Sequence, residues 1–122
     1  MGKKTVIIGA TPDPSRYAYL AARMLLEYRH EIVPVSIKTG EVFGHEILDL
    51  RKKPLINGVD TVTLYIGTRN QAEWIDYILS LAPKRIIFNP GTENDDFEQR
   101  AEALGIEALE ACTLVMLRSG QY

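Results

Sequence analysis

The residues best suited to chemistry lie in one short loop, Gly9 to Arg16, directly after the apolar run Thr5 to Ile8. A buried strand that turns through a small, hydroxyl-rich loop into a helix points backbone N–H groups and the helix N-terminus at one position, which attracts phosphate. The loop contains one glycine and matches neither the G-x-G-x-x-G dinucleotide fingerprint nor the G-x-x-x-x-G-K-[ST] loop of nucleotide triphosphatases. We therefore expect a different phosphate-binding loop, in which Ser15 and Arg16 supplement the backbone.

The end of the expected second strand narrows the class of phosphate ligand. Folds that bind NAD usually place an acidic residue there to hold the ribose hydroxyls. This chain has Ser36, Ile37 and Lys38 instead, with Glu41 nearby. Because a lysine suits a phosphate on that ribose, NADP and coenzyme A are favoured, while plain NAD is disfavoured rather than excluded.

The single cysteine and the two histidines do not form an obvious catalytic set. The sequence gives Cys112 no activating neighbour, because His30 falls at the end of the first helix and His45 in a variable loop. We expect Cys112 to be buried and structural, and His30 to be an imidazolium beside the helix C-terminus. No catalytic residue is predicted.

Acidic and aromatic clusters also have structural explanations. Asp95, Asp96 and Glu98 have the composition of a metal site, but they fall near a helix N-terminus, where the dipole favours acids. Trp74 and Tyr77 have rings that stack on bases in other proteins, yet their position on a packed helix predicts core or interface. No metal ligand is predicted.

The hydrophobic pattern predicts strands that alternate with helices, and this order would bring the candidate residues together. Residues of one apolar face recur at helical spacing from Tyr17 to Tyr28. The expected strands are 5–8, 31–36, 61–66, 84–88 and 106–109, and the expected helices are 17–28, 70–82 and 94–104.

Several helix starts carry capping signals. Either Asp13 before Pro14 or Ser15 suits the cap of the first helix, and the sequence does not distinguish them. Asn70 followed by Glu73 resembles a capping pair that would open the second helix.

Three segments are harder to assign from their pattern. Pro34 lacks an N–H group, so the second strand should be unpaired on one side at that point. A short helix is expected around 45–50, and the tail over 112–117 is either a terminal helix or a strand extension.

Short connections between strands and helices imply parallel pairing through right-handed crossovers. The predicted fold class is α/β: a three-layer, doubly wound, Rossmann-like fold with a mainly parallel sheet of about five strands, as one domain over residues 1–122. Ligands of such sheets bind beyond the carboxyl ends of the strands, where strand order reverses. Four segments lie at those ends: 9–16, 36–38, 66–69 and 89–92.

Composition limits the partners that we expect. The formal net charge is -2, with 14 basic and 16 acidic residues, so no global field favours nucleic acid or an acidic membrane. Neither an apolar run of about 18 residues nor a cysteine pair is present, which fits a cytoplasmic protein in a reducing compartment. Unpaired edge strands in so small a sheet leave a homodimer or a partner subunit open.

A pattern along the whole chain resembles the small CoA-binding domain proteins, which are stand-alone relatives of the N-terminal domain of the succinyl-CoA synthetase alpha subunit. The matching residues span nearly all of the chain: Gly9-Ala10-Thr11, Pro14-Ser15-Arg16-Tyr17, Val33-Pro34-Val35, Gly44, Val59-Asp60, Ile66, Gly91, Gly105-Ile106 and Cys112. Many relatives have Val-Asn-Pro where this chain has Val35-Ser36-Ile37, and an aromatic residue and glutamine where it has Phe88-Asn89-Pro90-Gly91.

The resemblance implies a site for coenzyme A (CoA) or an acyl-CoA. Its phosphates would meet the first loop, and Lys38 and the second strand end would flank the adenosine. The loop after the third strand would lie along the adenine or pantetheine, and the loop after the fourth strand would close the other side of the crevice. The implied ligand-binding residues are Gly9, Ala10, Thr11, Pro12, Ser15, Arg16, Tyr17, Val35, Ser36, Lys38, Tyr65, Ile66, Gly67, Asn89, Pro90 and Gly91.

The function that this resemblance implies is non-catalytic binding of CoA or acyl-CoA by a sensor, carrier or accessory subunit. Two alternatives remain at this stage. One is a small enzyme that uses NADP or another nucleotide, and the other is an interaction module that keeps the fold without a ligand.

Overall fold

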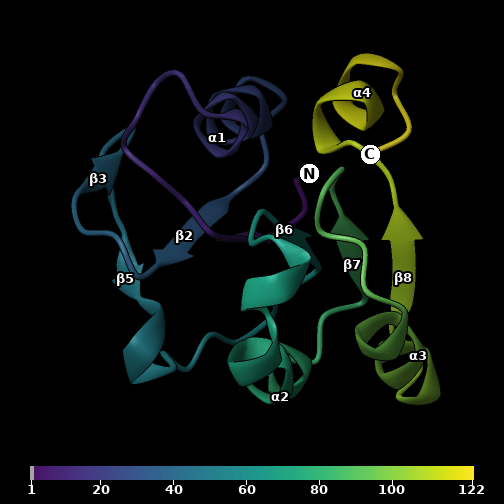
Figure 1. The fold of residues 1–122 in the computed structure, drawn as a ribbon. Helices are drawn as coiled ribbons and strands as arrows, with labels where there is room; N and C mark the ends of the chain where they lie inside the picture. Colours follow the sequence, from purple (N-terminus) through teal and green to yellow (C-terminus); the bar gives the residue numbers. More distant parts are fainter. Residues whose placement is uncertain (1) are drawn as a thin grey trace.

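Six short strands form one parallel sheet in the order β5-β2-β1-β6-β7-β8 (Figure 1). The computed structural model describes residues 2–122. The three-layer α/β fold predicted from the sequence is confirmed, with six strands rather than five. The strands of this sheet are β1 (Thr5–Ile8), β2 (Ile32–Ser36), β5 (Leu48–Asp49), β6 (Thr61–Leu64), β7 (Arg85–Phe88) and β8 (Glu107–Glu110).

The additional strand comes from the segment that was expected to be a short helix, so that prediction was wrong. β3 (Glu41–Val42) and β4 (His45–Glu46) form an antiparallel hairpin, and β5 follows directly. The two loop residues Phe43 and Gly44 both have positive φ, at 50° and 80°, which favours a tight hairpin turn. Strands of two residues are too short to show a period of two in the sequence.

Pro34 lies where β2 is paired on one side only. It lies opposite Ile7 in the β1–β2 pair, but the pairing of β2 with β5 begins only at Val35. The missing N–H of Pro34 therefore faces the side on which no strand is paired at that position, and the prediction is confirmed.

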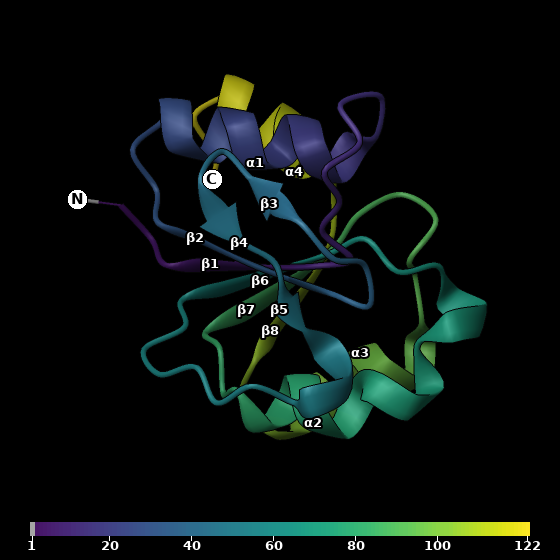
Figure 2. The same ribbon diagram turned by 90° about the vertical axis from the view of Figure 1, so that its left-hand side faces the viewer.

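Helices cover both faces of the sheet (Figure 2). α1 (Tyr17–Glu27) and α4 (Thr113–Arg118) lie together on one face, and α2 (Ile75–Ser80) and α3 (Asp95–Ala103) lie on the other. Because side chains alternate along a strand, Ile7 of β1 packs in the core under α1 and α4, while Val6 and Ile8 pack in the opposite core. The C-terminal segment is thus a helix and not a strand extension.

The capping signals of the first two expected helices do not act as predicted. Asn94, which was not among the cap candidates, accepts a hydrogen bond from Phe97 N–H and caps α3. α1 begins at Tyr17 without a side-chain cap, so neither candidate serves. Before α2 the chain makes two single turns, η2 (Thr68–Asn70) and η3 (Ala72–Trp74), and the predicted cap at Asn70 does not form.

The far edge of the sheet holds a contact between the two ends of the chain. His30 Nδ1 accepts a hydrogen bond from Lys3 N–H at 2.9 Å, and its ring meets Tyr122 edge-on at 4.7 Å. Burial, with Lys3 and Arg85 nearby, lowers the pKa of His30. The prediction of an imidazolium stabilised by the helix C-terminus is therefore wrong.

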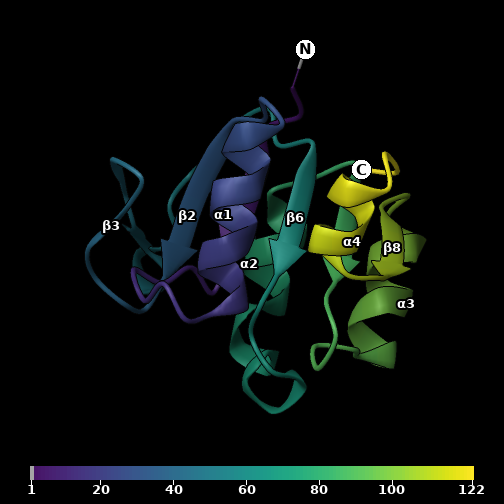
Figure 3. The ribbon, with the colours of Figure 1, turned by 90° about the horizontal axis from the view of Figure 1, so that it is seen from above.

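The strand order reverses at β1, which pairs with β2 on one side and with β6 on the other. From above, the carboxyl ends of the parallel strands share one edge of the molecule (Figure 3). That edge carries the segments that the sequence placed at the site. Within residues 2–122, no helix is long and apolar enough to cross a membrane.

Candidate functional site

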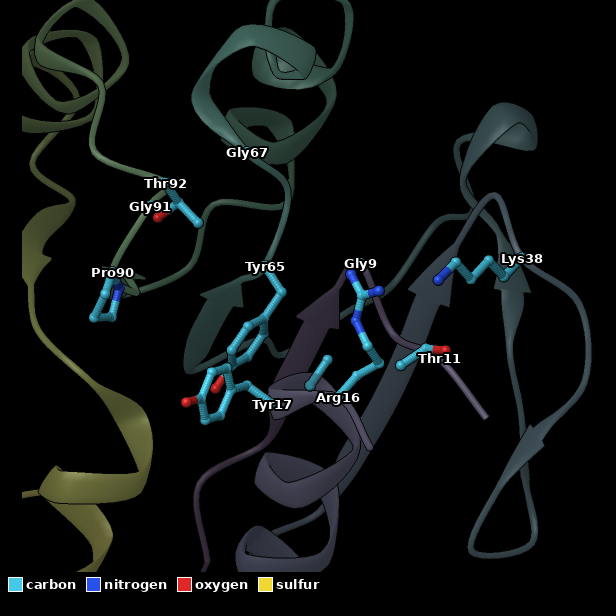
Figure 4. A pocket seen from close by; sticks show the side chains of 11 residues that line it. Gly9, Thr11, Arg16, Tyr17, Lys38, Tyr65, Gly67, Pro90, Gly91 and Thr92 are labelled. Atoms are coloured by element: carbon cyan, nitrogen blue, oxygen red, sulfur yellow. The ribbon is translucent and has the colours of Figure 1, made fainter. Parts of the chain in front are cut away.

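Three adjoining cavities run along the carboxyl edge of the sheet and share walls. The central cavity, of about 220 Å³, lies between the first loop and the loops after β6 and β7 (Figure 4). A polar arm of about 380 Å³ extends from it toward the end of β2 and Trp74. An apolar arm of about 240 Å³ extends toward Cys112 and Leu114. Tyr65 lines all three, so together they form one crevice.

Close approach of two strand ends explains the glycine of the first loop. Gly9 has φ of +95°, and a Cβ there would lie 3.0 Å from the carbonyl carbon of Tyr65. Its N–H donates to the Val35 carbonyl at 2.9 Å, and Ala10 N–H donates to the same oxygen at 3.3 Å. The N–H groups of Gly9 and Ala10 thus hold the first loop against β2. The resemblance had implied that backbone groups of these residues contact the CoA phosphates.

The middle of the loop is ordered by its own side chains. Thr11 Oγ1 accepts a hydrogen bond from Asp13 N–H at 3.1 Å, which leaves the Thr11 hydroxyl hydrogen available to a ligand. Asp13 Oδ1 accepts hydrogen bonds from Ser15 N–H at 2.9 Å and from the Ser15 hydroxyl at 2.7 Å. These bonds lower the pKa of Asp13, and they direct the Ser15 hydroxyl toward Asp13 rather than the cavity.

The N-terminus of α1 opens onto the central cavity. Arg16 occupies the N-cap position, and the first turn contains no acidic residue. The N–H groups of Tyr19 and Leu20 donate to Arg16 carbonyl, while those of Tyr17 and Ala18 have no acceptor within the helix. Ala18 lines the cavity. The helix end and Arg16 thus both present positive charge to the central cavity.

Two cationic side chains converge on this position. Arg16 reaches toward Gly9, and Lys38 points from the end of β2 toward Arg16 (Figure 4). Within the described part of the chain, neither forms an ion pair. Both charges act on Asp13 and help to lower its pKa, but neither cation is ion-paired with it, so positive charge is concentrated beside the helix N-terminus in a chain whose net charge is negative.

Two tyrosines form the wall between the central cavity and the apolar arm. The rings of Tyr17 and Tyr65 lie beside one another in Figure 4. Tyr17 is 71% exposed although it lines both cavities. The Tyr65 hydroxyl is buried without a hydrogen-bond partner among residues 2–122, and burial raises the pKa of Tyr65.

One buried glutamine joins the loops after β6 and β7. Gln71 is 0% exposed, and its Nε2 donates to Ile66 carbonyl at 2.8 Å and to Thr92 carbonyl at 2.7 Å. Its Oε1 accepts from Asn94 Nδ2 at 2.8 Å. Sequence reasoning did not identify Gln71, because nothing local distinguishes this glutamine from an exposed one.

The side-chain amide of Asn89 is also hydrogen-bonded within the protein. Its Nδ2 donates to Thr63 Oγ1 at 2.8 Å and to Leu64 carbonyl at 3.0 Å. Its Oδ1 accepts from Thr113 N–H at 2.9 Å, at the first residue of α4. The amide of Asn89 therefore orients α4 against the crevice, while Pro90 and Gly91 form the wall.

The structure brings most of the implied ligand-binding residues to the crevice. Ala10, Pro12, Ser15 and Val35 do not line the three cavities, and Val35 is a fully buried core residue. The implied residues that do line the crevice are Gly9, Thr11, Arg16, Tyr17, Ser36, Lys38, Tyr65, Ile66, Gly67, Asn89, Pro90 and Gly91.

Several residues that line the crevice were not among the implied set, and three of them bear on its chemistry. Trp74 lines the polar arm, and its aromatic type was the only sequence signal for it. Thr92 lines the central cavity. Cys112 is half-buried rather than fully buried and lines the apolar arm, so it is not the enclosed core cysteine that was expected.

Acidic side chains gather beside α3, outside the residues that line the crevice. The carboxylates of Asp95, Glu98 and Glu110 lie within 4.8 Å of one another. Glu98 Oε2 accepts a hydrogen bond from Asn94 N–H at 3.1 Å, and burial followed by the proximity of Glu110 raises the pKa of Glu98. Asp95 and Glu98 belong to the first turn of α3, which is the dipole-compensating role predicted for them.

Comparison with known protein families identifies the family of this chain. The model of the CoA binding domain matches residues 3–118. The chain belongs to the CoA binding domain family. No curated protein matches.

Solved structures of similar proteins agree with the fold. An uncharacterized protein is 54% identical, with a TM-score of 0.96, over 100% of this chain and 99% of that one. The structure of cell-free ID.343 from Thermus thermophilus is 25% identical, with a TM-score of 0.85, over 99% of this chain and 91% of that one. A dinucleotide-forming acetyl-coenzyme A synthetase from Ca. Korarchaeum cryptofilum, in complex with phosphate and ADP, is 19% identical over 89% of this chain and 25% of that one, with a TM-score of 0.74.

Proposed function

We propose that this protein binds CoA or an acyl-CoA in the crevice at the carboxyl edge of the sheet, without catalysing a reaction. The observation that carries the proposal is the convergence of Arg16, Lys38 and the uncapped start of α1 on one cavity. Membership of the CoA binding domain family supports the class of ligand.

The three cavities match the three parts of CoA in order. The pyrophosphate occupies the central cavity, against Arg16 and the free N–H groups of α1. The adenosine enters the polar arm, where Trp74 offers an aromatic face and Lys38 is near the position of the ribose phosphate. The pantetheine then passes Gly91 toward the apolar arm.

The chemistry of the crevice lining supports binding without catalysis. Glu73 is the only carboxylate among its described residues, and histidine does not occur there. The raised pKa of Tyr65 keeps that phenol protonated at neutral pH. General acid–base catalysis needs a group whose pKa lies near the working pH, and this lining offers no pair of that kind.

A second candidate ligand is NADP, because Lys38 at the end of β2 suits any ribose phosphate. A thermal-shift panel with CoA, 3′-dephospho-CoA, acetyl-CoA, NADP, NAD and ADP separates the two. A ligand at about one hundred times its Kd stabilises by about 2.7 kcal/mol, which moves the Tm of a domain of this size by several degrees. We expect CoA to raise the Tm more than 3′-dephospho-CoA does.

Two results would count against the proposal in different ways. A shift with NADP and none with CoA would replace the ligand by a dinucleotide. No shift with any of the six compounds would leave an interaction module that keeps the fold without a small-molecule ligand.

A further inference from the structure

We propose that the apolar arm of the crevice holds the acyl group of the ligand and selects uncharged acyl chains of about four to six carbons. This inference rests on the proposed binding of CoA. It adds a second specificity element at the opposite end of the crevice from the adenosine. Its basis is the position, size and chemistry of the arm.

The position of the arm places it where the thiol end of CoA would lie. It shares Tyr17, Tyr65 and Pro90 with the central cavity, and it extends away from the polar arm toward Cys112 and Leu114. A ligand whose phosphates occupy the central cavity and whose adenosine fills the polar arm therefore directs its other end into the apolar arm.

The described lining of the arm offers a charged ligand no cation and no free side-chain amide. The Asn89 amide, the only amide in the lining, is fully engaged with Thr63, Leu64 and the N–H of Thr113. None of the described residues that line the arm is cationic, since Arg16 and Lys38 line only the central cavity and the polar arm. A carboxylate at the end of an acyl chain would lose its hydration there without gaining a cationic partner, and a hydrogen bond from the free Tyr65 hydroxyl would offset only part of that cost.

The size of the arm sets the chain length. Its volume is about 240 Å³ and it is open on one side. If each methylene takes about 30 Å³, close to the share of one water in the liquid, the arm holds the thioester and about four to six carbons. A bound chain would also cover the ring of Tyr17, an aromatic side chain left 71% exposed.

Calorimetry with CoA and its acetyl, butyryl, hexanoyl, decanoyl and succinyl thioesters tests the proposal on the unmodified protein. We expect affinity to rise by about fourfold per added methylene from acetyl to hexanoyl, and to gain nothing further at decanoyl. Succinyl and butyryl chains have the same number of carbons and differ in a terminal carboxylate. We therefore expect succinyl-CoA to bind at least tenfold more weakly than butyryl-CoA.

A variant that fills the arm gives a second measurement. Cys112→Leu adds bulk to the lining, so it should remove the gain in affinity from acetyl to hexanoyl that the unmodified protein shows. Val115→Leu is the matched control, because Val115 is 58% exposed on the same helix and does not line the arm. If Cys112→Leu does not fold, the thioester series on the unmodified protein still decides.

The outcomes separate the two proposals. If CoA and every thioester fail to bind, the proposed function itself is wrong. If CoA binds but chain length makes no difference, or if succinyl-CoA binds as tightly as butyryl-CoA, the acyl site is overturned while the proposed function stands.

Discussion

Arg16 combines two properties that are unusual in one residue. Its backbone ends the first loop and starts α1, and its guanidinium reaches into the central cavity without a carboxylate partner among the described residues. A cation at the positive end of a helix raises the energy of the free protein, and a bound anion removes that cost. The same argument does not hold for Arg23, which lies on the same helix 4.0 Å from Glu27.

Arg16→Ala tests this role directly. We expect the variant to lose the thermal shift with CoA and to weaken binding by tenfold or more, because a charged hydrogen bond to phosphate contributes about 1.5–3 kcal/mol. The Tm of the free protein should stay the same or rise, since Arg16 has no ion-pair partner in the part of the chain that the structure describes. Calorimetry and thermal melting measure the two effects.

Arg23→Ala is the matched control, and it should bind CoA as the unmodified protein does. A fall in the free protein's Tm with Arg16→Ala alone would show that Arg16 serves the fold and not a ligand.

At the scale of elements, the loops after β6 and β7 act as one rigid wall because Gln71 joins them. The carbonyls of Ile66 and Thr92 both depend on its amide. This buried contact also explains why the expected cap at Asn70 fails. The chain makes two tight turns around Gln71 instead of starting a regular helix at Asn70.

Gln71→Ala should lower the free energy of unfolding by about 2–4 kcal/mol, because it leaves the two carbonyls without their partner and opens a small void. Binding of CoA should weaken too, since Gly67 and Gly91 lie on the two loops that Gln71 holds together. Urea denaturation measures the first effect and calorimetry the second.

The comparison variant is Gln99→Ala on the exposed surface of α3, which should change neither quantity. A Gln71→Ala protein as stable as the unmodified one would mean that water replaces the amide and that the two loops do not depend on it.

At the scale of the whole molecule, the two ends of the chain meet at the edge of the sheet opposite to the crevice. The Tyr122 hydroxyl hydrogen-bonds with Thr5 Oγ1, and the Arg85 guanidinium lies 4.3 Å from the centre of the Tyr122 ring. His30 packs against the same ring and accepts from Lys3 N–H. The contact ties β1, β7 and the C-terminus together, so it links the stability of the sheet to the charge of His30.

The pKa of His30 is lowered in the folded protein, first by burial and then by the positive charges of Lys3 and Arg85, against a smaller opposing effect of Asp60. The unfolded chain therefore binds a proton at higher pH than the folded protein does. Stability from this group is present above the ordinary histidine pKa of about 6.5 and is lost as pH falls through that value toward the lower folded pKa.

We expect the free energy of unfolding to decrease between about pH 7 and pH 5, and His30→Gln to flatten that decrease, since a glutamine carbonyl accepts from Lys3 N–H without titrating. Urea denaturation across this range measures it. His45→Gln, at the hairpin turn, should keep the slope of the unmodified protein. An equal slope in His30→Gln would assign the pH dependence to other groups.

Local signals in the sequence were enough for the fold class and for the region of the site. The buried run of β1, the helical spacing of α1 and the lysine after β2 are properties of neighbouring residues, which act the same way in any fold that contains them. The α/β layering follows from their order, because parallel strands need crossovers. Family resemblance then narrowed the expected phosphate ligand to CoA, which remains a proposal for this crevice.

Contacts between distant residues decided the rest. The side-chain amides of Gln71 and Asn89 form hydrogen bonds within the protein, and the N–H groups of Gly9 and Ala10 donate to β2. Cys112 lines the crevice. All of these contacts arise because segments far apart in the sequence meet at one edge of the sheet. Strand β5 forms by pairing with the free edge of β2. Its two residues are too few to show a strand pattern in the sequence. The sequence by itself determined the α/β order and the loop that we propose as the phosphate site, while the tertiary structure decided which polar groups of that loop and its neighbours remain free for a ligand.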